Sequence, residues 1–459
     1  MAFVLDISKS GAMAQIIMPK IKKVRNMQKF SNTMYIPSCY ALHVGGKMLA
    51  KNDIENAYER IRHDIVLSPC LYSAHLSDLT SARVFLKLEN MQFTGSFKER
   101  GALNFLLGHQ NMAIKHVVAA SAGNHAQAVA RHSARLGILA TIFMPIGTPN
   151  NKIVQTERLQ AAVKLVGNNY DEAYEAALDF ANATHAKYVH GYDDPYVIAG
   201  QGTIGLEVVQ QIGVPDVIII PVGGGGMLAG IAHYFAHSAG PKRPDIIGVE
   251  AKAFRSMAQV LDFHTGWSVT PEKTIADGIA VLNIGRLTRD MCAAYRPFMT
   301  SVSDDQIQNA MMILLERQKI ISEGAGAAAT AALLLAQNRE RLLGKTVVVI
   351  VSGGNVDISL LSRLTGQALI GSSRMCRLSC VIKDSPGSLS KLLAKITNAL
   401  GNIIDIAHER SFAALKWNEV LVTITVETKD GLHEKNLLSM LDAEGYDISI
   451  HKSEKNFGL

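Results

Sequence analysis

Short runs of consecutive apolar residues, separated by stretches of helical periodicity, recur between about residue 80 and residue 355. Because nearly every side chain of a run is apolar, rather than every second one, both faces of each strand are expected to be covered. The runs lie at 84–88, 116–120, 140–144, 163–166, 217–221, 246–249 and 346–351. Such strands, alternating with helices, predict an α/β fold with largely parallel, doubly wound sheets, whose ligands lie at the carboxyl ends of the strands.

A second pattern begins near residue 377. It predicts a strand at 378–382, a helix at 388–400, strands at 403–408 and 420–426, a helix at 432–443 and a strand at 448–451. This β-α-β-β-α-β order is that of a ferredoxin-like module. Ser385 or Ser388 is expected to cap the first helix, and Gly371, Ser372 and Ser373 are expected to link the module to the preceding region.

Length and composition limit the classes of protein that this chain can belong to. A single hydrophobic core seldom serves 459 residues, and 48% hydrophobic with 19% charged residues is typical of well-packed domains. No apolar run reaches the roughly 18 residues of a membrane span, so no membrane contact is expected. The net charge of +6 is modest, which argues against a nucleic-acid partner. The five cysteines include no CxxC pair, which predicts reduced thiols, a cytoplasmic protein and no zinc site.

The first 47 residues differ from the rest, because they are basic and contain one acidic residue, Asp6. An acid-poor, basic leader is typical of an organellar targeting segment, but arginine is scarce here and amphipathic periodicity is weak. The alternatives are a disordered extension or a true start at Met48. We therefore expect an extension at 1–47, an α/β domain at 48–370 and the ferredoxin-like module at 375–455.

Three segments that follow expected strands contain residue types suited to catalysis. TGSFKERGA at 94–102 places Lys98 between small residues, although an exposed lysine at a helix start would give the same pattern. SAGNHAQ at 121–127 and the four glycines at 223–226 each lead from a buried strand into a helix, so their backbone N–H groups can converge on an anion. One glycine loop alone is weak evidence. Together these parts can hold a phosphorylated aldehyde cofactor as a Schiff base beside an amino acid.

These motifs resemble those of a known family. SFKERGA, SAGNHAQ, GGGGM and the late VSGGN closely resemble the threonine dehydratases among the fold-type II, tryptophan-synthase-β-like pyridoxal-phosphate enzymes. The resemblance covers about residues 50–365 and implies two subdomains and pyridoxal 5′-phosphate as the cofactor. It also implies that Lys98 forms the Schiff base and later removes the Cα proton of the substrate.

The same resemblance implies the residues around the cofactor. Phe97 would pack against its ring, Asn124 would bind its phenolic oxygen, and Ser352 would face its pyridine nitrogen. The phosphate would be held by Gly223, Gly224, Gly225, Gly226 and Met227, and the substrate carboxylate by Ser121, Ala122, Gly123, Asn124 and His125. A neutral serine favours prompt β-elimination over transamination, because the pyridine nitrogen need not be protonated. Alternatively, Ser352 only caps a turn.

Three further positions have two interpretations. Glu323 matches a family position close to the cofactor ring, but it also fits an ordinary charge at a helix start. Gly278, in the segment 276–278, matches a family position near the substrate, with a plain turn as the alternative. His125 equally fits a packed neighbour of the ring, because a histidine beside an anion-binding loop is not thereby an acid or base.

The expected reaction converts L-threonine to 2-oxobutanoate and ammonia, and L-serine to pyruvate and ammonia. A serine racemase or a serine or hydroxyaspartate dehydratase is the nearest alternative. The related racemases have a second serine where this chain has Ala122, which has no proton to give, so dehydration is favoured. Glu250 matches one cation ligand of some relatives, but 251–258 offers no carboxylate partner, and no metal is expected. A catalytically inactive regulatory protein is a further alternative, against which the intact motifs argue.

The C-terminal module resembles an ACT domain, with KDSPGSL at 383–389 as its strand-to-helix loop. This implies a homo-oligomer, a dimer or a tetramer, whose activity responds to a branched-chain amino acid such as isoleucine. Only one such unit fits in 375–455, whereas the longer biosynthetic enzymes carry two. A dimerisation module without a ligand is the alternative.

Overall fold

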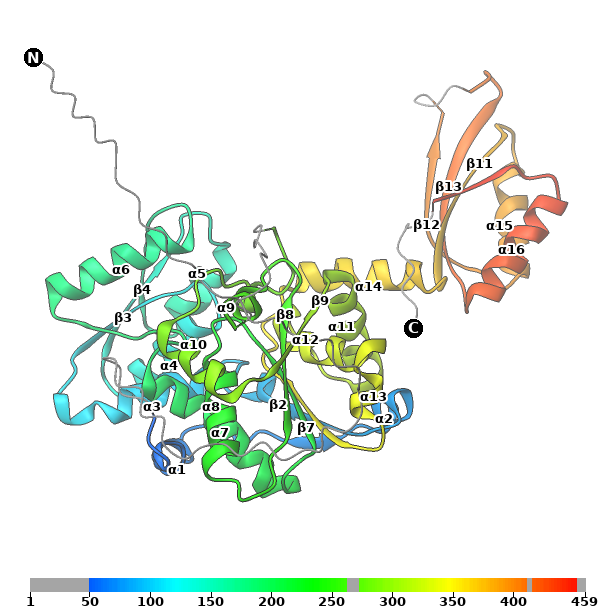
Figure 1. Ribbon diagram of the computed structural model, residues 1–459. Coiled ribbons are helices and arrows are strands. Elements are labelled where there is room, and N and C mark those ends of the chain that lie inside the picture. Colours follow the sequence, from blue (N-terminus) through cyan, green and yellow to red (C-terminus); the bar gives the residue numbers. More distant parts are fainter. Residues whose placement is uncertain (1–48, 262–271, 411–414, 452–459) are drawn as a thin grey trace, which may run out of the picture. The chain divides into compact units, whose positions relative to one another are not determined.

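The computed structural model describes residues 49–261, 272–410 and 415–451 (Figure 1). The segment 1–47 and Met48, for which the sequence leaves targeting, disorder or an internal start open, lie outside the described residues.

A six-stranded sheet forms the larger part of the α/β region. Its strand order is β1-β2-β10-β7-β8-β9, and every pair except β1 with β2 is parallel. The strands are β1 (Cys70–Tyr72), β2 (Arg83–Leu88), β7 (Val217–Pro221), β8 (Asp245–Ala251), β9 (Phe298–Val302) and β10 (Thr346–Val351).

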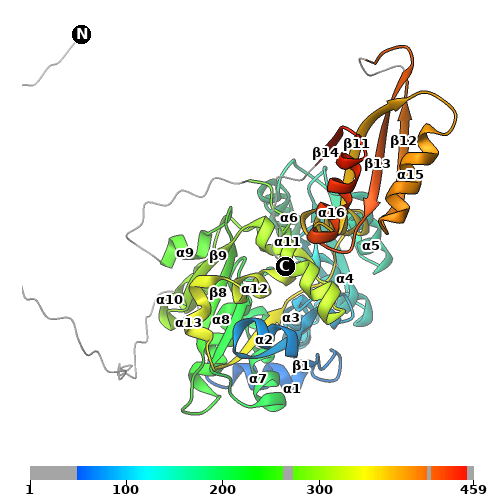
Figure 2. The same cartoon turned by 90° about the vertical axis from the view of Figure 1, so that its right-hand side faces the viewer.

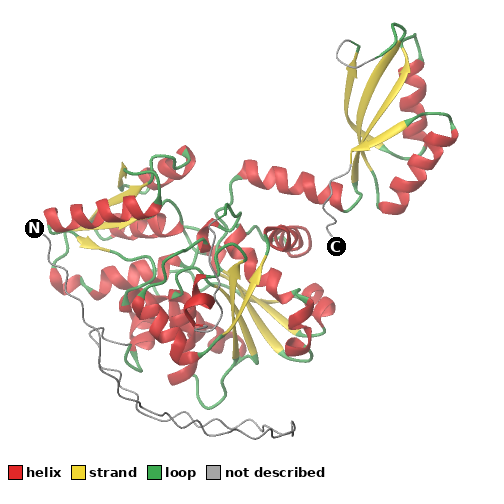
Figure 3. Cartoon of the chain, turned by 45° about the horizontal axis from the view of Figure 1, so that its top comes forward, coloured by secondary structure: helices red, strands yellow, loops and turns green. Residues whose placement is uncertain are grey.

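Figure 3 draws the strands in yellow and shows a second, smaller sheet, whose four parallel strands lie between β2 and β7 in the chain. Its order is β5-β4-β3-β6. The strands are β3 (His116–Ala120), β4 (Leu139–Met144), β5 (Ala162–Leu165) and β6 (Lys187–Tyr188). The two sheets confirm the predicted α/β class with two subdomains.

Fourteen α-helices of the described residues precede, connect or follow these strands. They are α1 (Asp53–Ile61), α2 (Ala74–Thr80), α3 (Lys98–Gly108), α4 (Asn124–Arg135), α5 (Asn150–Arg158), α6 (Tyr170–Thr184), α7 (Pro195–Ile212), α8 (Gly226–His237), α9 (Ser256–Leu261), α10 (Arg286–Tyr295), α11 (Asp304–Gln318), α12 (Gly324–Leu333), α13 (Arg339–Leu342) and α14 (Ile358–Gly371). Short 3-10 helices occur at η1 (Glu89–Met91), η2 (Gln110–Met112), η3 (Asp277–Ile279) and η4 (Ala336–Asn338). None of the helices in the described ranges is both long enough and apolar enough to cross a bilayer.

Helices cover both faces of the large sheet. In β10, Val347 and Val349 pack in a core with α11 and α12, whereas Val348 and Ile350 pack in a second core with α7 and α8. The small sheet shows the same alternation, since neighbouring residues of β3 belong to two different cores. Successive side chains of a strand point to opposite faces, so covering both faces requires nearly every residue to be apolar.

The C-terminal module has a different sheet, which is antiparallel throughout and has the order β12-β13-β11-β14 (Figure 2). Its strands are β11 (Met375–Lys383), β12 (Asn402–Glu409), β13 (Glu419–Glu427) and β14 (Ile448–His451), and its helices are α15 (Ser388–Asn398) and α16 (Gly431–Ala443). One core lies between these helices and the sheet. The predicted β-α-β-β-α-β order is confirmed and is compatible with an ACT-like domain.

Some local predictions are wrong. Gly387, with φ at +88°, is the N-cap residue of α15, while the hydroxyls of Ser385 and Ser388 bond to each other at 2.8 Å instead of capping the helix. Gly371 is the last residue of α14 and not part of a linker. The sequence pattern also missed β1, β6 and β9, because the first two are only three and two residues long and β9 contains polar residues.

Candidate active site

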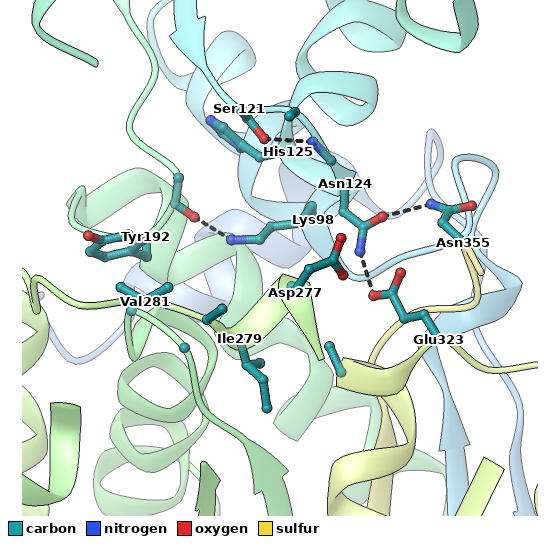
Figure 4. Close-up of a pocket in the computed structure, with 18 of the residues that line it drawn as sticks. Lys98, Ser121, Asn124, His125, Tyr192, Asp277, Ile279, Val281, Glu323 and Asn355 are labelled. Carbon is teal, nitrogen blue, oxygen red and sulfur yellow. Dashed lines mark hydrogen bonds between the residues drawn. The ribbon is translucent and has the colours of Figure 1, made fainter. Parts of the chain in front are cut away.

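A cavity of about 570 Å³ lies at the carboxyl ends of strands from both sheets, within the size range of small-molecule sites. The loops that follow β2, β3, β7 and β10 contribute to its walls. Every site residue predicted from the sequence lines this cavity, and Figure 4 shows several of the side chains converging. Segments far apart in the chain therefore form one pocket.

Lys98 is the first residue of α3 and lies in this cavity. Its Nζ atom donates to the carbonyl oxygen of Gly191 at 2.7 Å. Burial lowers the pKa of Lys98 to about 8, although the nearby carboxylate of Glu323 raises it. Roughly a tenth of the amine is then neutral at pH 7, and only the neutral amine can attack an aldehyde or accept a proton. The alternative of an exposed lysine is wrong.

The four glycines at 223–226 connect β7 to α8. A Cβ atom on Gly224 would lie 2.2 Å from Cγ of Tyr192, and one on Gly223 would lie 3.1 Å from Cα of Ile279. Gly225 has φ at +86° and is the N-cap residue of α8. Larger residues at 223 and 224 would therefore collide with these neighbours, and the glycines line the cavity at the N-terminus of α8, where backbone N–H groups can bind an anion. Met227, in the first turn of α8, also lines the cavity.

The loop at 121–125 leads from β3 into α4. The N–H of Ser121 donates to the carbonyl of Phe143 at 3.0 Å. This N–H is therefore not available to a substrate carboxylate, contrary to the expectation for Ser121. The N–H of Gly123 donates to the Ser121 hydroxyl at 3.2 Å. A Cβ on Gly123 would meet nothing within 4 Å, so there is open space beside the first turn of α4, whose N–H groups have no acceptor within the helix. Ala122 also lines the cavity.

His125 is buried, and its Nε2 atom lies 2.9 Å from the carbonyl oxygen of Val189. Burial, aided by the charge of Lys98, lowers the pKa of His125 to about 3. The ring is therefore neutral near pH 7, and its Nε2–H donates to that carbonyl. This geometry agrees with the interpretation of His125 as a packed neighbour.

Asn124, Glu323 and Asn355 form a chain of hydrogen bonds beside the cavity (Figure 4). The Nδ2 atom of Asn124 donates to Oε1 of Glu323 at 2.7 Å, and Nδ2 of Asn355 donates to Oδ1 of Asn124 at 2.8 Å. Glu323 is the N-cap residue of α12, but its side chain makes no capping bond. Burial raises the pKa of Glu323 to about 7, and the negative charge of Asp277 acts in the same direction.

Ser352 and Phe97 line the same cavity. The Ser352 hydroxyl lies 3.4 Å from the carbonyl oxygen of Ala325, and the N–H of Phe97 donates to the carbonyl oxygen of Ser352 at 3.1 Å. The backbone of the turn at 352–355 is thus bonded directly to the residue that precedes Lys98.

A further wall of the cavity contains η3. A Cβ on Gly278 would lie 3.0 Å from Cβ of Ala325 and 3.4 Å from Oε1 of Glu323. Asp277 forms an ion pair at 2.6 Å with Lys152 of α5. The ion pair connects η3 with a helix of the subdomain that contains the small sheet.

Glu250 has a structural role in this protein. Its carboxylate accepts hydrogen bonds from the N–H groups of Met257, at 2.6 Å, and Ala258, at 3.0 Å, at the start of α9. Burial raises its pKa to about 7. In the part of the chain that the structure describes, no group of three or more His, Cys, Asp or Glu side chains could hold a metal ion.

Three residues near the predicted ones were missed by sequence reasoning: Tyr192, Lys152 and Asn355. Asn355 had a signal, since it ends the VSGGN motif directly after a buried strand. Tyr192 and Lys152 belong to no motif considered. Their roles depend on contacts with Gly224 and Asp277, which lie far away in the chain.

Comparisons with known proteins agree with this geometry. A family model described as pyridoxal-phosphate dependent enzyme matches residues 61–353. The L-threonine ammonia-lyase of Thermotoga maritima is 38% identical over 404 residues, which cover 88% of this chain and 100% of that protein.

Two solved structures are similar to the α/β region. The processed form of threonine deaminase isoform 2 from Solanum lycopersicum is 35% identical, with a TM-score of 0.62, and the match covers 70% of this chain and 90% of that one. A pyridoxal 5′-phosphate-dependent aspartate racemase is 31% identical, with a TM-score of 0.64, and the match covers 69% and 98%. The family match extends over more than half of the chain, and it includes all the motifs that line the cavity except the end of the last turn. This chain belongs to the family of pyridoxal-phosphate-dependent enzymes.

Proposed function

We propose that the protein is a pyridoxal-phosphate-dependent ammonia-lyase that converts L-threonine to 2-oxobutanoate and ammonia, and L-serine to pyruvate and ammonia. The observation that carries the proposal is the placement of Lys98, whose pKa is lowered to about 8, in one cavity with the glycine loop at 223–226. A relative named for the threonine activity is 38% identical over its whole length.

The residues of the cavity fit the cofactor. The glycine loop lines the cavity at the α8 N-terminus, where Gly223 to Met227 would hold the phosphate. Asn124 has a second amide proton, beyond the one donated to Glu323, for the phenolic oxygen. Ser352 would face the pyridine nitrogen and Phe97 the ring. Pyridoxal phosphate, when bound, supplies an aldehyde that condenses with amines and a conjugated ring that draws electrons from Cα.

Proton transfer and substrate binding are carried out by different groups of the protein. Lys98 Nζ accepts the proton from the substrate Cα, which requires the neutral amine that burial favours. The backbone from Ala122 to His125 binds the substrate carboxylate at the α4 N-terminus and orients the Cα–H bond toward Lys98. The β-hydroxyl leaves as water, and the released enamine takes up water and gives ammonia. Threonine thus becomes 2-oxobutanoate plus ammonia without an oxidant or reductant.

Racemisation is less favoured on this geometry. A racemase has to deliver a proton to the face of Cα opposite the lysine. Ala122 has no proton to deliver, and neutral His125 is engaged with Val189. Likeness to an aspartate racemase therefore reflects the shared fold.

The direct test is borohydride reduction followed by peptide mass mapping, together with turnover of threonine and serine. The purified protein is expected to absorb in the visible range through its cofactor, and the reduced pyridoxyl group is expected on Lys98. A label on another lysine, or none, would contradict the proposal. Comparing kcat/KM for the two substrates then ranks them, because one methyl group is worth about 1 to 3 kcal/mol in an apolar pocket.

We also infer that the protein forms a homo-oligomer in the cytoplasm and that the C-terminal module binds a branched-chain amino acid such as isoleucine. The module offers β12 as a sheet edge, with Ile404 at 55% and Ile406 at 38% exposure. An exposed, partly apolar edge strand can pair with the same strand of a second copy. Four cysteines of the described ranges, Cys70, Cys292, Cys376 and Cys380, are free thiols, which suits a reducing compartment.

Titrating threonine turnover with isoleucine, valine and serine tests the effector. Serine, as an alternative substrate, should only compete with threonine, so a change in rate or cooperativity with isoleucine or valine that differs from simple competition supports the inference. Turnover unchanged by isoleucine and valine, in a protein that sediments as a dimer or tetramer, leaves the module as a dimerisation unit only.

A further inference from the structure

The turn at 352–355 is bonded to two segments of the site through its backbone. It meets the loop before Lys98, where the N–H of Gly354 donates to the carbonyl of Gly95 at 2.9 Å. It also meets the start of α12, where the N–H of Glu323 donates to the carbonyl of Gly353 at 3.1 Å. The side chain of Asn355 adds a third segment, because it bonds to Asn124 of α4.

There is little space around this junction. A Cβ atom on Gly95 would lie 2.6 Å from Oδ1 of Asn355, and one on Gly353 would lie 2.3 Å from Oε1 of Glu323 and 3.2 Å from Nδ2 of Asn124. The two glycines therefore allow the polar side chains to approach each other closely. Close packing on all sides restricts these side chains to a few orientations.

The hydrogen bonds fix which way each amide faces. Nδ2 of Asn355 donates to the carbonyl oxygen of Thr94 at 2.7 Å, and a backbone carbonyl can only accept, so this end must be nitrogen. The second proton of the same nitrogen goes to Asn124, which must therefore present its oxygen. Consequently, the nitrogen of Asn124 faces Glu323 and the cavity (Figure 4).

We propose that Asn355 is a positioning residue of the reaction: by bonding to the Thr94 carbonyl it holds the Asn124 amide with its nitrogen toward the cavity, whatever the protonation state of Glu323. This rests on the proposed function, in which that nitrogen donates to the cofactor. An ionised Glu323 would impose the same orientation, because a carboxylate only accepts. A protonated Glu323 can also donate. In that state only the hydrogen bond from Asn355 to the Thr94 carbonyl keeps the Asn124 amide from exchanging its oxygen and nitrogen positions.

Glu323 titrates in a charged environment. Asp277 of η3, Lys152 of α5 and Lys98 of α3 act on it through their charges, and Asn124 and the backbone of Asn355 donate hydrogen bonds to it. Its pKa, about 7, lies inside the working range of most enzymes, so both of its protonation states are populated there. An anchor that does not titrate, such as a backbone carbonyl, keeps the site in one arrangement through that range.

The sharpest variant is Asn355→Asp in the holoenzyme, because it has nearly the same shape but replaces the donor by an acceptor. Below pH 7, where most of Glu323 is protonated and can donate, the Asn124 amide is then expected to turn its nitrogen toward position 355 and its oxygen toward Glu323 and the cavity. The absorption maximum of the bound cofactor should shift, and kcat for threonine should fall at least tenfold while KM changes less than threefold. A native spectrum together with kcat within twofold of native would overturn the proposal.

Asn90→Asp is the matched control. The Asn90 side chain donates to the carbonyl oxygen of Ile321 at 3.0 Å and packs against Gly354 of the same turn, but it does not bond to Asn124 or Glu323. The substitution therefore adds the same charge and removes the same kind of bond next to the turn. We expect the spectrum of the bound cofactor to stay as in the native protein. An equal shift in both variants would also overturn the specific role of Asn355.

Asn355→Ala decides the question if Asn355→Asp fails to fold. Without the anchor, protonated Glu323 can donate to the Asn124 oxygen, so the cofactor spectrum should gain a transition near pH 7 that the native protein lacks. The double variant Asn355→Ala with Glu323→Gln should lose that transition again. A general loss of activity without the added transition would indicate a merely structural role. If the native protein itself lacks a cofactor absorption band, the proposed function fails. If the native band is present and the Asn355 variants have the same spectrum and the same kcat, only the positioning role fails.

Discussion

The α/β region and the C-terminal module use strands in opposite ways. All five residues of β7 are buried, whereas β11 alternates between buried and exposed positions and β12 is exposed at nearly every position. Helices cover both faces of the sheets in the first region but only one face in the second. The first arrangement can enclose a cavity that keeps water from a neutral lysine, while the second leaves a face and an edge for another molecule.

The two regions also differ in where they place charges. Arg100, two residues after Lys98, is fully buried and bonds to Glu89 and Glu207, both at 2.7 Å, and Lys87 joins Glu207 at 2.6 Å. This network ties α3 to α7 and β2. In the C-terminal module the pair of Arg410 and Asp384 is solvent-exposed. Buried charges of opposite sign need one another, whereas exposed ones are already stabilised by water.

The largest expected effect separates chemistry from stability. Lys98→Ala should lower kcat for threonine by roughly 10³-fold or more, because it removes the base and the attachment point of the cofactor. Thermal unfolding of the C-terminal module should be unchanged. The rate of 2-oxobutanoate formation gives kcat, and calorimetry measures the thermal unfolding. Residual turnover within tenfold of native would contradict the role of Lys98.

The next effect compares two arginines. Arg100→Met should reduce the free energy of unfolding of the α/β region by about 3 to 5 kcal/mol, since it leaves the buried carboxylate of Glu89 without its cationic partner and Glu207 with Lys87 alone. Arg410→Met, which breaks the exposed pair in the module, should produce no measurable change. Urea unfolding of both variants tests the contrast. Equal losses would mean that the two regions do not differ in this respect.

Two glycines with matched backbone angles give a smaller contrast. Gly225 and Gly445 have φ at +86° and +82°, so alanine at either position costs about 1 to 2 kcal/mol of left-handed strain. Only at Gly225 would the new Cβ meet a close neighbour, Cε of Met257 at 2.3 Å, within the glycine loop. We expect Gly225→Ala to weaken cofactor binding roughly tenfold or more, and Gly445→Ala to leave it unchanged. Fluorescence titration of the cofactor-free variants measures this.

The smallest effect concerns pH. Below the Lys98 pKa of about 8, each pH unit lowers the neutral fraction of the amine about tenfold, so capture of the cofactor by cofactor-free protein should slow accordingly. Above pH 8 the rate of cofactor capture should level off. With a lysine of ordinary pKa the rate would continue to rise up to about pH 10. Glu323→Gln removes a charge that raises the Lys98 pKa, so the midpoint should move to lower pH. A rate that still rises tenfold between pH 9 and pH 10 would exclude a lowered pKa.

The sequence by itself determined the strands at 84–88, 116–120 and 217–221, the order of the C-terminal module, and the segments that contribute to the cavity. Burial on two faces requires unbroken apolar runs, and a loop between a strand and a helix has the same backbone chemistry wherever it occurs. These are local properties, so they can be read along the chain. The N-cap of α15 shows the limit of such local prediction. Ser385 and Ser388 are both residue types that favour an N-cap, but Gly387 is the N-cap residue in the structure.

Only the tertiary structure decided which side chains meet. Glu323 contacts Asn124 instead of capping its own helix, Tyr192 requires glycine at position 224, and Asn355 bonds to Thr94. Each contact joins segments that lie far apart in the sequence, and its geometry depends on how strands and helices pack in three dimensions. The direction of a hydrogen bond and the pKa of a buried group follow from distances of a few ångströms, which no spacing along the chain contains.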